Sequence, residues 1–186
     1  FELAQEVGDH DLLRREAPAL GLSRDFVVYD SSDQLAVVKH AMKTMGIDDK
    51  MLQPRAALSR ISQAKNRMET PDTMRGSGWN LRDQQMSRIY DAYRRALDDA
   101  GALDFDDLLL KTVELVEGHE HIRAAYATRF RYIMVDEYQD TNRPQYLLIK
   151  RLAEIHKNLC VVGDPDQSIY RWRGADLRNI LDFEHD

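Results

Sequence analysis

Two short apolar runs, separated by a segment of helix length, are the feature of this sequence that most limits its fold. The first run, RYIMV (131–135), is followed at once by Asp136 and Glu137. The second run is NLCVV (158–162), and the segment between them, 144–156, has helical character and begins with proline, as helices often do. A strand, a helix and a strand at this spacing predict a βαβ unit with parallel strands and a right-handed crossover.

Both runs are apolar throughout, so we expect helices to cover both faces of this sheet. Cys160 lies within the second run and is expected to be a buried packing residue. As the only cysteine it forms no internal disulfide, which fits a reducing cytoplasm. No apolar stretch approaches the roughly 20 residues that a membrane-spanning helix needs. We therefore expect a cytoplasmic protein without a membrane partner.

The part of the chain between residues 22 and 100 reads as a small all-helical unit. Ser31 and Gln34 have the spacing of a capping box, and Gly46 is expected to end the helix that they start. The segment 69–80 is rich in turn-forming residues and is predicted to be a loop. The predicted helices of this unit are 32–45, 54–68 and 81–100. After it, Asp104 is expected to cap a short helix that precedes the first strand.

The charge is unevenly distributed. The formal net charge of −6 does not suggest a nucleic-acid partner, yet residues 55–95 hold nine basic and four acidic residues. A local basic surface of this kind can meet phosphate groups whatever the total charge. A solvated helix surface explains the same pattern, and charge alone leaves both interpretations open.

Acidic residues follow both predicted strands. Asp136 and Glu137 follow the first, and Asp164 and Asp166 follow the second. Ligands of parallel sheets bind outside the carboxyl ends of the strands, and carboxylates that converge there need a cation such as Mg²⁺. The second acid of the first pair would then orient or deprotonate a water molecule. This is the metal-and-water element of P-loop nucleotide hydrolases, although phosphatases, signalling receivers and plain strand ends share the pattern.

The segment VVGDPDQSIYRWRGA (161–175) adds a second kind of chemistry. Gln167 places an uncharged amide near the same edge, where it could contact a terminal phosphate or the attacking water. Tyr170, Trp172 and Arg173 then alternate aromatic and guanidinium groups, which suit stacking on bases and neutralising phosphates of a single strand. A core position for Trp172 is the alternative. With nucleotide-sensing and base-stacking groups in one short loop, hydrolysis could move the stacking platform.

These residues carry a family resemblance. VDEYQDTNRPQ (135–145) and VVGDPDQSIYRWRGA (161–175) resemble helicase motifs II and III of the UvrD/PcrA/Rep-type superfamily 1 DNA helicases. ALDFDDLL (102–109) is similar to the stretch that this family carries just before motif II. ISQAKN (61–66) and YDSSDQL (29–35) resemble its helical insert. The resemblance covers roughly residues 12–186.

The resemblance implies an α/β fold, namely a partial RecA-like P-loop NTPase domain of parallel strands and helices plus an all-α inserted subdomain. Residues 1–21 would supply a helix of the ATPase domain, 22–100 the insert, and 101–186 the ATPase part with motifs II and III. It also implies an ATP-dependent 3′-to-5′ helicase, in DNA repair or replication, that couples ATP hydrolysis to movement on single-stranded DNA. Implied partners are single-stranded DNA, junctions with duplex, and the remaining domains of a parent helicase.

By matching position, the resemblance implies a role for each motif residue. Asp136 would bind Mg²⁺, and Glu137 would be the base that activates water. Gln167 would sense the γ-phosphate of ATP, and the other two motif II residues, Gln139 and Asp140, would link that motif to its neighbours. The residues expected to contact single-stranded DNA are Tyr170, Trp172 and Arg173.

One departure from the family pattern limits this expectation. No Gly-Lys pair occurs in the chain, so the phosphate-binding loop G-x-x-x-x-G-K-[ST] is missing and is expected to lie upstream. The arginine fingers of downstream motifs are missing as well. The chain on its own is therefore expected to lack ATPase activity. Two rival hypotheses stay open: a non-catalytic helical module that binds DNA or protein, and a Mg²⁺ nuclease or phosphatase built on the same acids.

Overall fold

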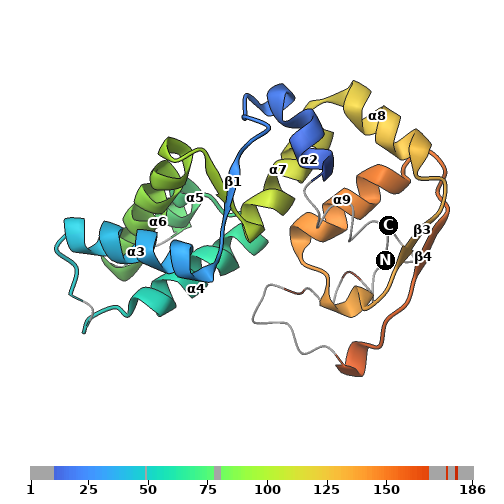
Figure 1. Ribbon diagram of the computed structural model, residues 1–186. Coiled ribbons are helices and arrows are strands. Elements are labelled where there is room, and N and C mark those ends of the chain that lie inside the picture. Colours follow the sequence, from blue (N-terminus) through green and yellow to red (C-terminus); the bar gives the residue numbers. More distant parts are fainter. Residues whose placement is uncertain (1–10, 49, 78–80, 168–174, 176–178, 180–186) are drawn as a thin grey trace. The chain divides into compact units, whose positions relative to one another are not determined.

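The computed structural model describes residues 11–48, 50–77, 81–167, 175 and 179. The chain divides into two compact units (Figure 1). The helical unit is Asp25–Asp107, and the α/β unit combines Phe1–Arg24 with Leu108–Asp186. The chain therefore passes between the units twice, once after Arg24 and once after Asp107.

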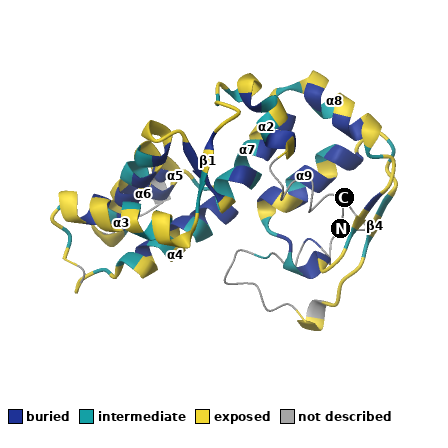
Figure 2. Cartoon of the chain, in the orientation of Figure 1, coloured by how far each residue is buried: buried dark blue, intermediate teal, exposed yellow. Residues whose placement is uncertain are grey.

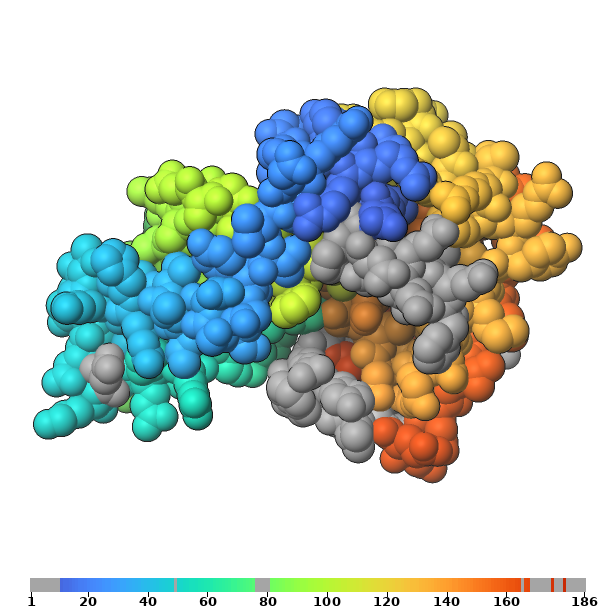
Figure 3. Space-filling view, viewed as in Figure 1, coloured from blue at the N-terminus to red at the C-terminus, as the bar shows by residue number. Residues whose placement is uncertain are grey.

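The helical unit is built from helices that pack their apolar stripes together. Its α-helices are α3 (Ser31–Thr44), α4 (Pro54–Asn66), α5 (Pro71–Ser77) and α6 (Leu81–Asp99). Figure 3 shows the outward side chains of α3 at the surface of this unit. The stripe of α6 predicted from the helical period is buried in the core, at Met86, Ile89, Tyr90, Tyr93 and Leu97.

The start of α3 differs from the prediction. Asp30, not Ser31, is the capping residue, and Asp33, not Gln34, completes the capping box. The Asp30 carboxylate accepts hydrogen bonds from the backbone N–H groups of Ser32 (2.7 Å) and Asp33 (3.0 Å). The Asp33 carboxylate accepts one from the N–H of Asp30 (3.1 Å). This cap places two carboxylates near the positive end of the helix dipole. It is therefore more favourable than the predicted cap, which would use the hydroxyl of Ser31 and the amide of Gln34.

The prediction missed two features of the helical unit. Strand β1 (Val27–Tyr29) pairs in parallel with β2 (Ala102–Asp104), with Val28 opposite Leu103. Three-residue strands are too short to show a period. The predicted loop 69–80 is wrong as well, because α5 occupies most of its described part. Pro71 lies at the first position of this helix, where a backbone N–H would have no partner within the helix. At the same end, the N–H of Thr70 donates to Oγ1 of Thr73 (2.8 Å) and the N–H of Thr73 donates to Oγ1 of Thr70 (3.2 Å).

The α/β unit contains the predicted βαβ arrangement. Strands β3 (Ile133–Val135) and β4 (Leu159–Val161) are parallel, with Met134 opposite Cys160, and α9 (Arg143–Ala153) connects them. This confirms the α/β fold class with parallel strands. Among the described residues, the other α-helices of the unit are α2 (Asp11–Glu16), α7 (Phe105–Gly118, which begins in the helical unit) and α8 (Glu120–Arg129).

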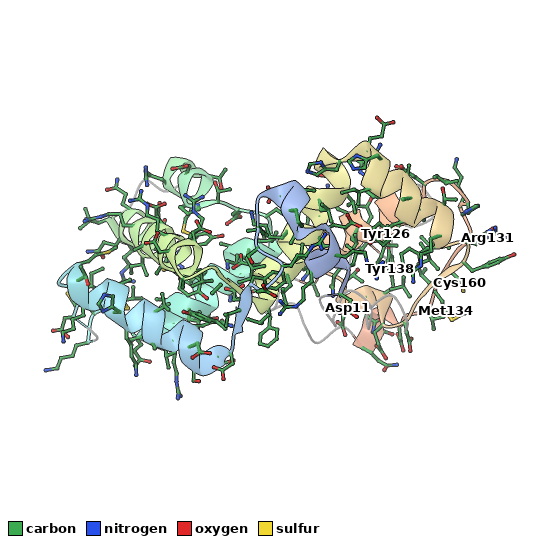
Figure 4. The ribbon with its side chains drawn as sticks, turned by 45° about the horizontal axis from the view of Figure 1, so that its top comes forward. Asp11, Tyr126, Arg131, Met134, Tyr138 and Cys160 are labelled. Atoms are coloured by element: carbon green, nitrogen blue, oxygen red, sulfur yellow. The ribbon has the colours of Figure 1, made fainter. Side chains whose placement is uncertain are left out.

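Within the described residues, one face of the β3–β4 pair is packed and the other is exposed. Ile133 joins α7, α8 and α9 in a common core, with Leu159 packed against it. On the opposite face, Tyr132 is 83% exposed and Met134 64%, and Figure 2 shows the exposed positions in yellow. Cys160 lies beside Met134 and is exposed too (Figure 4). The predictions of two covered faces and a buried cysteine are therefore wrong for this part of the chain.

No helix in the described ranges combines the length and the apolar character needed to cross a membrane.

Candidate functional site

The carboxyl ends of β3 and β4 bring the predicted acidic residues to one edge of the sheet. Val135 and Val161 are register partners in parallel strands, so the residues after them leave the sheet at the same end. Asp136 follows β3 directly, and Asp164 follows β4 after a two-residue extension. The backbone N–H of Tyr138 donates to the carbonyl of Val162 (3.0 Å), which extends the contact between the two segments beyond the strands.

Asp136 and Glu137 form a tight turn at this edge. Both are exposed, and Oδ1 of Asp136 accepts a hydrogen bond from the N–H of Glu137 (2.9 Å). Glu137 has φ 53° and ψ 40°, in the left-handed region that non-glycine residues rarely enter. Such a conformation costs about 1–3 kcal/mol and often occurs at functional sites. It turns the chain into a short 3₁₀ helix, Tyr138–Asp140.

Gln139 joins the two strand ends through its side-chain amide. It is fully buried, at 0% exposure. Its Nε2 donates to Oε2 of Glu137 (2.5 Å), and its Oε1 accepts from the N–H of Asp164 (3.0 Å). The carboxylate of Glu137 is therefore held by a group that also fixes the start of the segment after β4.

Gln167 lies at the end of the same chain of contacts. Its Nε2 donates to Oδ2 of Asp164 (2.6 Å), and its own N–H donates to the carbonyl of Asp164 (3.0 Å). The hydrogen bond from the Gln167 side chain, followed by the one from the N–H of Asp166, lowers the pKa of the Asp164 carboxyl. Hydrogen bonds thus run from Glu137 through Gln139 and Asp164 to Gln167.

Asp140 and its neighbour Thr141 differ in their contacts. Oδ1 of Asp140 is buried and has no hydrogen-bond partner in the part of the chain that the structure describes. Oγ1 of Thr141 donates to the carbonyl of Tyr138 (2.7 Å) and accepts from Nδ2 of Asn179 (3.0 Å). Thr141 was not predicted as a site residue. It ties the turn to a residue that lies 38 positions further along the chain.

Asn142 also contacts the later segment and was missed. It forms an isolated antiparallel bridge with Ala175. It also begins α9 through a capping box with Gln145: its Oδ1 accepts from the N–H of Gln145 (3.0 Å) and its N–H donates to Oε1 of Gln145 (2.9 Å). The spacing Asn-x-x-Gln before a helix was a readable signal for the cap, whereas nothing in the sequence indicates the bridge.

The predicted DNA-contacting residues Tyr170, Trp172 and Arg173 lie outside the described residues. The structure does describe Gln167, which precedes them in the chain, and Ala175, which follows them. Both of these flanking positions connect to the turn that follows β3, the first through Asp164 and Gln139 and the second through Asn142.

The carboxylate oxygens at this edge of the sheet are suitable ligands for Mg²⁺. Among the described residues no three His, Cys, Asp or Glu side chains form a metal cluster. Mg²⁺ does not require one, because it is usually bound through one or two carboxylates together with water and substrate phosphates. Asp136 is an exposed carboxylate at the strand end and suits that role. When bound there, the ion would neutralise phosphate charge.

Comparison with known proteins decides the family. Residues 9–186 match the family model described as UvrD/REP helicase N-terminal domain. The chain belongs to the UvrD/REP helicase family. It is 46% identical over 175 residues to "ATP-dependent DNA helicase PcrA" of Staphylococcus epidermidis RP62A, and equally so to that of Staphylococcus aureus Mu50. Each alignment covers 94% of this chain and 24% of the relative, so the UvrD/REP chain spans about a quarter of these proteins.

Proposed function

We propose that this chain is part of an ATP-dependent DNA helicase that moves 3′ to 5′ along single-stranded DNA. Asp136 holds Mg²⁺ with ATP, Glu137 deprotonates the attacking water, and Gln167 senses the γ-phosphate. Tyr170, Trp172 and Arg173 contact single-stranded DNA. Family membership supports the class of activity, because the relatives are named ATP-dependent DNA helicases.

The observation that carries this proposal is the hydrogen-bonded path from Glu137 through Gln139 and Asp164 to Gln167. A general base must be held in one orientation to act on a water, and the buried amide of Gln139 does this for Glu137. The same amide fixes the segment that leads to the proposed DNA-contacting residues. A change in nucleotide state at Glu137 thus has a short, specific route to the loop.

The helical unit supplies the proposed contact with the duplex at a junction. Lys65 cannot take part, because it is buried. Several other basic residues of the segment pair with acids of their own unit, including Arg60 with Asp83 and Arg95 with Asp91. Exposed arginines remain for phosphate contact, at Arg55, Arg67, Arg82 and Arg88.

Glu137→Gln in the full-length protein tests the proposed chemistry. The amide keeps the size of the side chain but cannot act as a base, so we expect DNA-stimulated ATP turnover to fall by about 10²–10⁴-fold. Binding of a fluorescent single-stranded oligonucleotide should stay within about twofold, since Glu137 is not proposed to touch DNA. Glu120→Gln, at an exposed position on α8, is the matched control and should change neither measurement. Unchanged turnover in Glu137→Gln would refute the assignment and favour a non-catalytic binding module.

The chain by itself is proposed to be inactive as an ATPase. It contains no Gly-Lys pair, so it lacks the lysine and the glycine-rich loop that hold the β- and γ-phosphates. We expect no phosphate release above background from the 186-residue chain, with or without single-stranded DNA and Mg²⁺. Robust DNA-stimulated turnover would contradict this proposal.

A further inference from the structure

A buried lysine in the helical unit has no place in the chemistry described above. Lys65, on α4, is 2% exposed, and its ammonium group is shared between two carboxylates. Its Nζ lies 2.7 Å from Oδ2 of Asp104 and 2.6 Å from Oδ1 of Asp107. Burial acts to lower the pKa of Lys65, but the charges of Asp107 and Asp104 outweigh it and leave the pKa raised, so the amine stays charged.

Further contacts join this region to α4 and α6, through Asp104 and through the neighbouring Asp106. The hydroxyl of Tyr93, on α6, donates to Oδ2 of Asp104 (2.7 Å), and the ammonium of Lys65 lies 5.2 Å from the centre of the Tyr93 ring. Asn66, next to Lys65, donates from Nδ2 to Oδ1 of Asp106 (3.1 Å). Residues from α4 and α6 therefore converge on the first turn of α7.

The lysine-bound carboxylates also start α7. Oδ1 of Asp104 accepts from the N–H of Asp107 (2.8 Å), and Oδ2 of Asp107 accepts from the N–H of Asp104 (3.2 Å). This reciprocal cap uses the same two side chains that bind Lys65. A buried ion pair is often no more stabilising than apolar residues of the same volume, so its value is better sought in the geometry that it imposes. Here that geometry is the position of the first turn of α7, which lies within the helical unit.

Helix α7 belongs to both units. Its residues up to Asp107 lie in the helical unit, and the remainder lies in the α/β unit, where Val113, Leu115 and Val116 are core residues. At the other crossing point, Arg24 is followed by β1, which is hydrogen-bonded to β2. Strand β2 ends at Asp104 itself. Both crossings are thus anchored in the helical unit, one of them through the Lys65 cluster (Lys65, Tyr93, Asp104 and Asp107).

We propose that Lys65 is a positioning residue for strand separation: it fixes the first turn of α7, so that ATP-driven movement of the α/β unit is passed through α7 to the helical unit. Lys65 takes no part in ATP hydrolysis or in contact with DNA. The inference rests on the proposed helicase function, in which one unit carries the ATPase motif and the other meets the duplex.

The test uses the double variant Lys65→Met/Asp107→Asn in the full-length protein. It removes the ammonium and one carboxylate together, while Asp104 keeps its hydrogen bonds from Tyr93 and from the N–H of residue 107. ATP turnover on single-stranded DNA and base pairs separated per ATP on a 3′-tailed duplex are measured side by side. We expect turnover within about twofold of the unmodified protein and about tenfold fewer base pairs per ATP, within the range typical of coupling between sites. Lys39→Met, at an exposed position on α3, is the control and should change neither.

The ratio of unwinding to hydrolysis separates this role from a merely structural one. If the cluster only stabilised the fold, loss of folded molecules would lower both rates together and leave the ratio unchanged, and that result would overturn the inference. A double variant that separates as many base pairs per ATP as the unmodified protein would overturn the inference as well. Absence of ATP-driven unwinding in the unmodified protein would instead refute the proposed function on which the inference depends.

A second measurement uses the 186-residue chain and a milder change. Tyr93→Phe removes one hydrogen bond to Asp104 and leaves Lys65 in place. Amide hydrogen exchange of residues 105–108 should then speed up relative to the first turn of α3, because the start of α7 is held less firmly. Equal exchange in the two proteins would count against the Lys65 cluster as the anchor of α7.

Discussion

Oε1 of Gln139 accepts a 3.0 Å hydrogen bond from the backbone N–H of Asp164, while Nε2 of the same amide donates to Glu137. One buried side chain thus connects the turn after β3 to the turn after β4. Among the described residues, the backbone hydrogen bonds between the two segments extend as far as that from Tyr138 to Val162, and the contact with Asp164 is made by the Gln139 side chain. The geometry of the candidate site consequently depends on this residue.

Gln139→Ala should weaken the α/β unit. The change leaves the N–H of Asp164 and the carboxylate of Glu137 without this partner and removes a fully buried side chain. We expect the free energy of unfolding to fall by about 1–3 kcal/mol, measured by urea denaturation of the chain. Gln84→Ala, at an exposed position of α6, should cost less than about 0.5 kcal/mol. Equal losses in the two variants would show that the Gln139 contacts carry no net stability.

Tyr93→Phe should destabilise the helical unit. Tyr93 is fully buried, and its hydroxyl donates to the carboxylate of Asp104 at 2.7 Å. Burial, together with the charge of Asp104, raises the pKa of this hydroxyl, so it is protonated and can donate at neutral pH. Hydrogen bonds to charged groups contribute about 1.5–3 kcal/mol, and a loss of this size is expected in chemical denaturation.

The matched control for that measurement is Tyr132→Phe. Tyr132 is 83% exposed, so removal of its hydroxyl should change the free energy of unfolding by less than about 0.5 kcal/mol. A Tyr93→Phe variant as stable as the Tyr132→Phe variant would contradict the role assigned to the buried hydroxyl.

The titration of Asp107 should make the helical unit less stable as the pH rises from about 4 to 6. Burial, opposed by Lys65 and reinforced by the charge of Asp104, raises the pKa of Asp107 from 3.8 to about 6. In this window the folded chain keeps a proton on Asp107 that the unfolded chain has already lost, so deprotonation favours unfolding. Burial also raises the pKa of Asp106, which acts in the same direction. Asp104, whose pKa is lowered against burial by the charge of Lys65 and by hydrogen bonds, acts in the opposite direction, mainly at and below pH 4.

Urea denaturation at pH 4.5 and at pH 7 measures this effect. Asp107→Asn removes the titrating group and should flatten the difference between the two pH values. Asp98→Asn, at an exposed position on α6, should leave the difference as it is in the unmodified chain. A pH dependence that Asp107→Asn does not reduce would rule out Asp107 as its source.

The start of α3 offers a test of the corrected cap. Asp30→Ala should lower the melting temperature at pH 7, because the N–H groups of Ser32 and Asp33 lose their acceptor. Ser31→Ala should have no such effect, although Ser31 was the residue predicted from the sequence. Hydrogen bonds, the largest from Ser32, lower the pKa of Asp30, so its contribution is present above pH 3.8 and is lost as the pH falls through the lowered value. If Ser31→Ala lowered the melting temperature at pH 7 more than Asp30→Ala did, Ser31 would be the capping residue.

The sequence predicted those parts of the fold whose signals are long or local. The apolar runs around 131–135 and 158–162 are separated by one helix, so their parallel pairing followed from the length of the connection. The apolar stripe of α6 is long enough to show a helical period. By contrast, β1 and β2 have three residues each and pair across more than seventy positions, and no local pattern reports such a contact.

The candidate site was predictable to a similar extent. The positions of Asp136 and Asp164 at one sheet edge followed from the βαβ topology. The contacts that connect them did not, because an amide such as that of Gln139 has no sequence pattern that reveals its two partners. The same holds for Thr141 and Asn179, which meet only because a distant part of the chain returns to the turn after β3.

The bare face of the β3–β4 pair has a practical consequence for handling the chain. Tyr132, Met134 and Val162 present apolar surface to solvent, and the Cys160 thiol lies among them. With such a surface, the purified 186-residue chain is expected to aggregate more as its concentration rises. Oxidation of the single thiol would also join chains covalently in pairs, so storage calls for dilute solutions and a reducing agent.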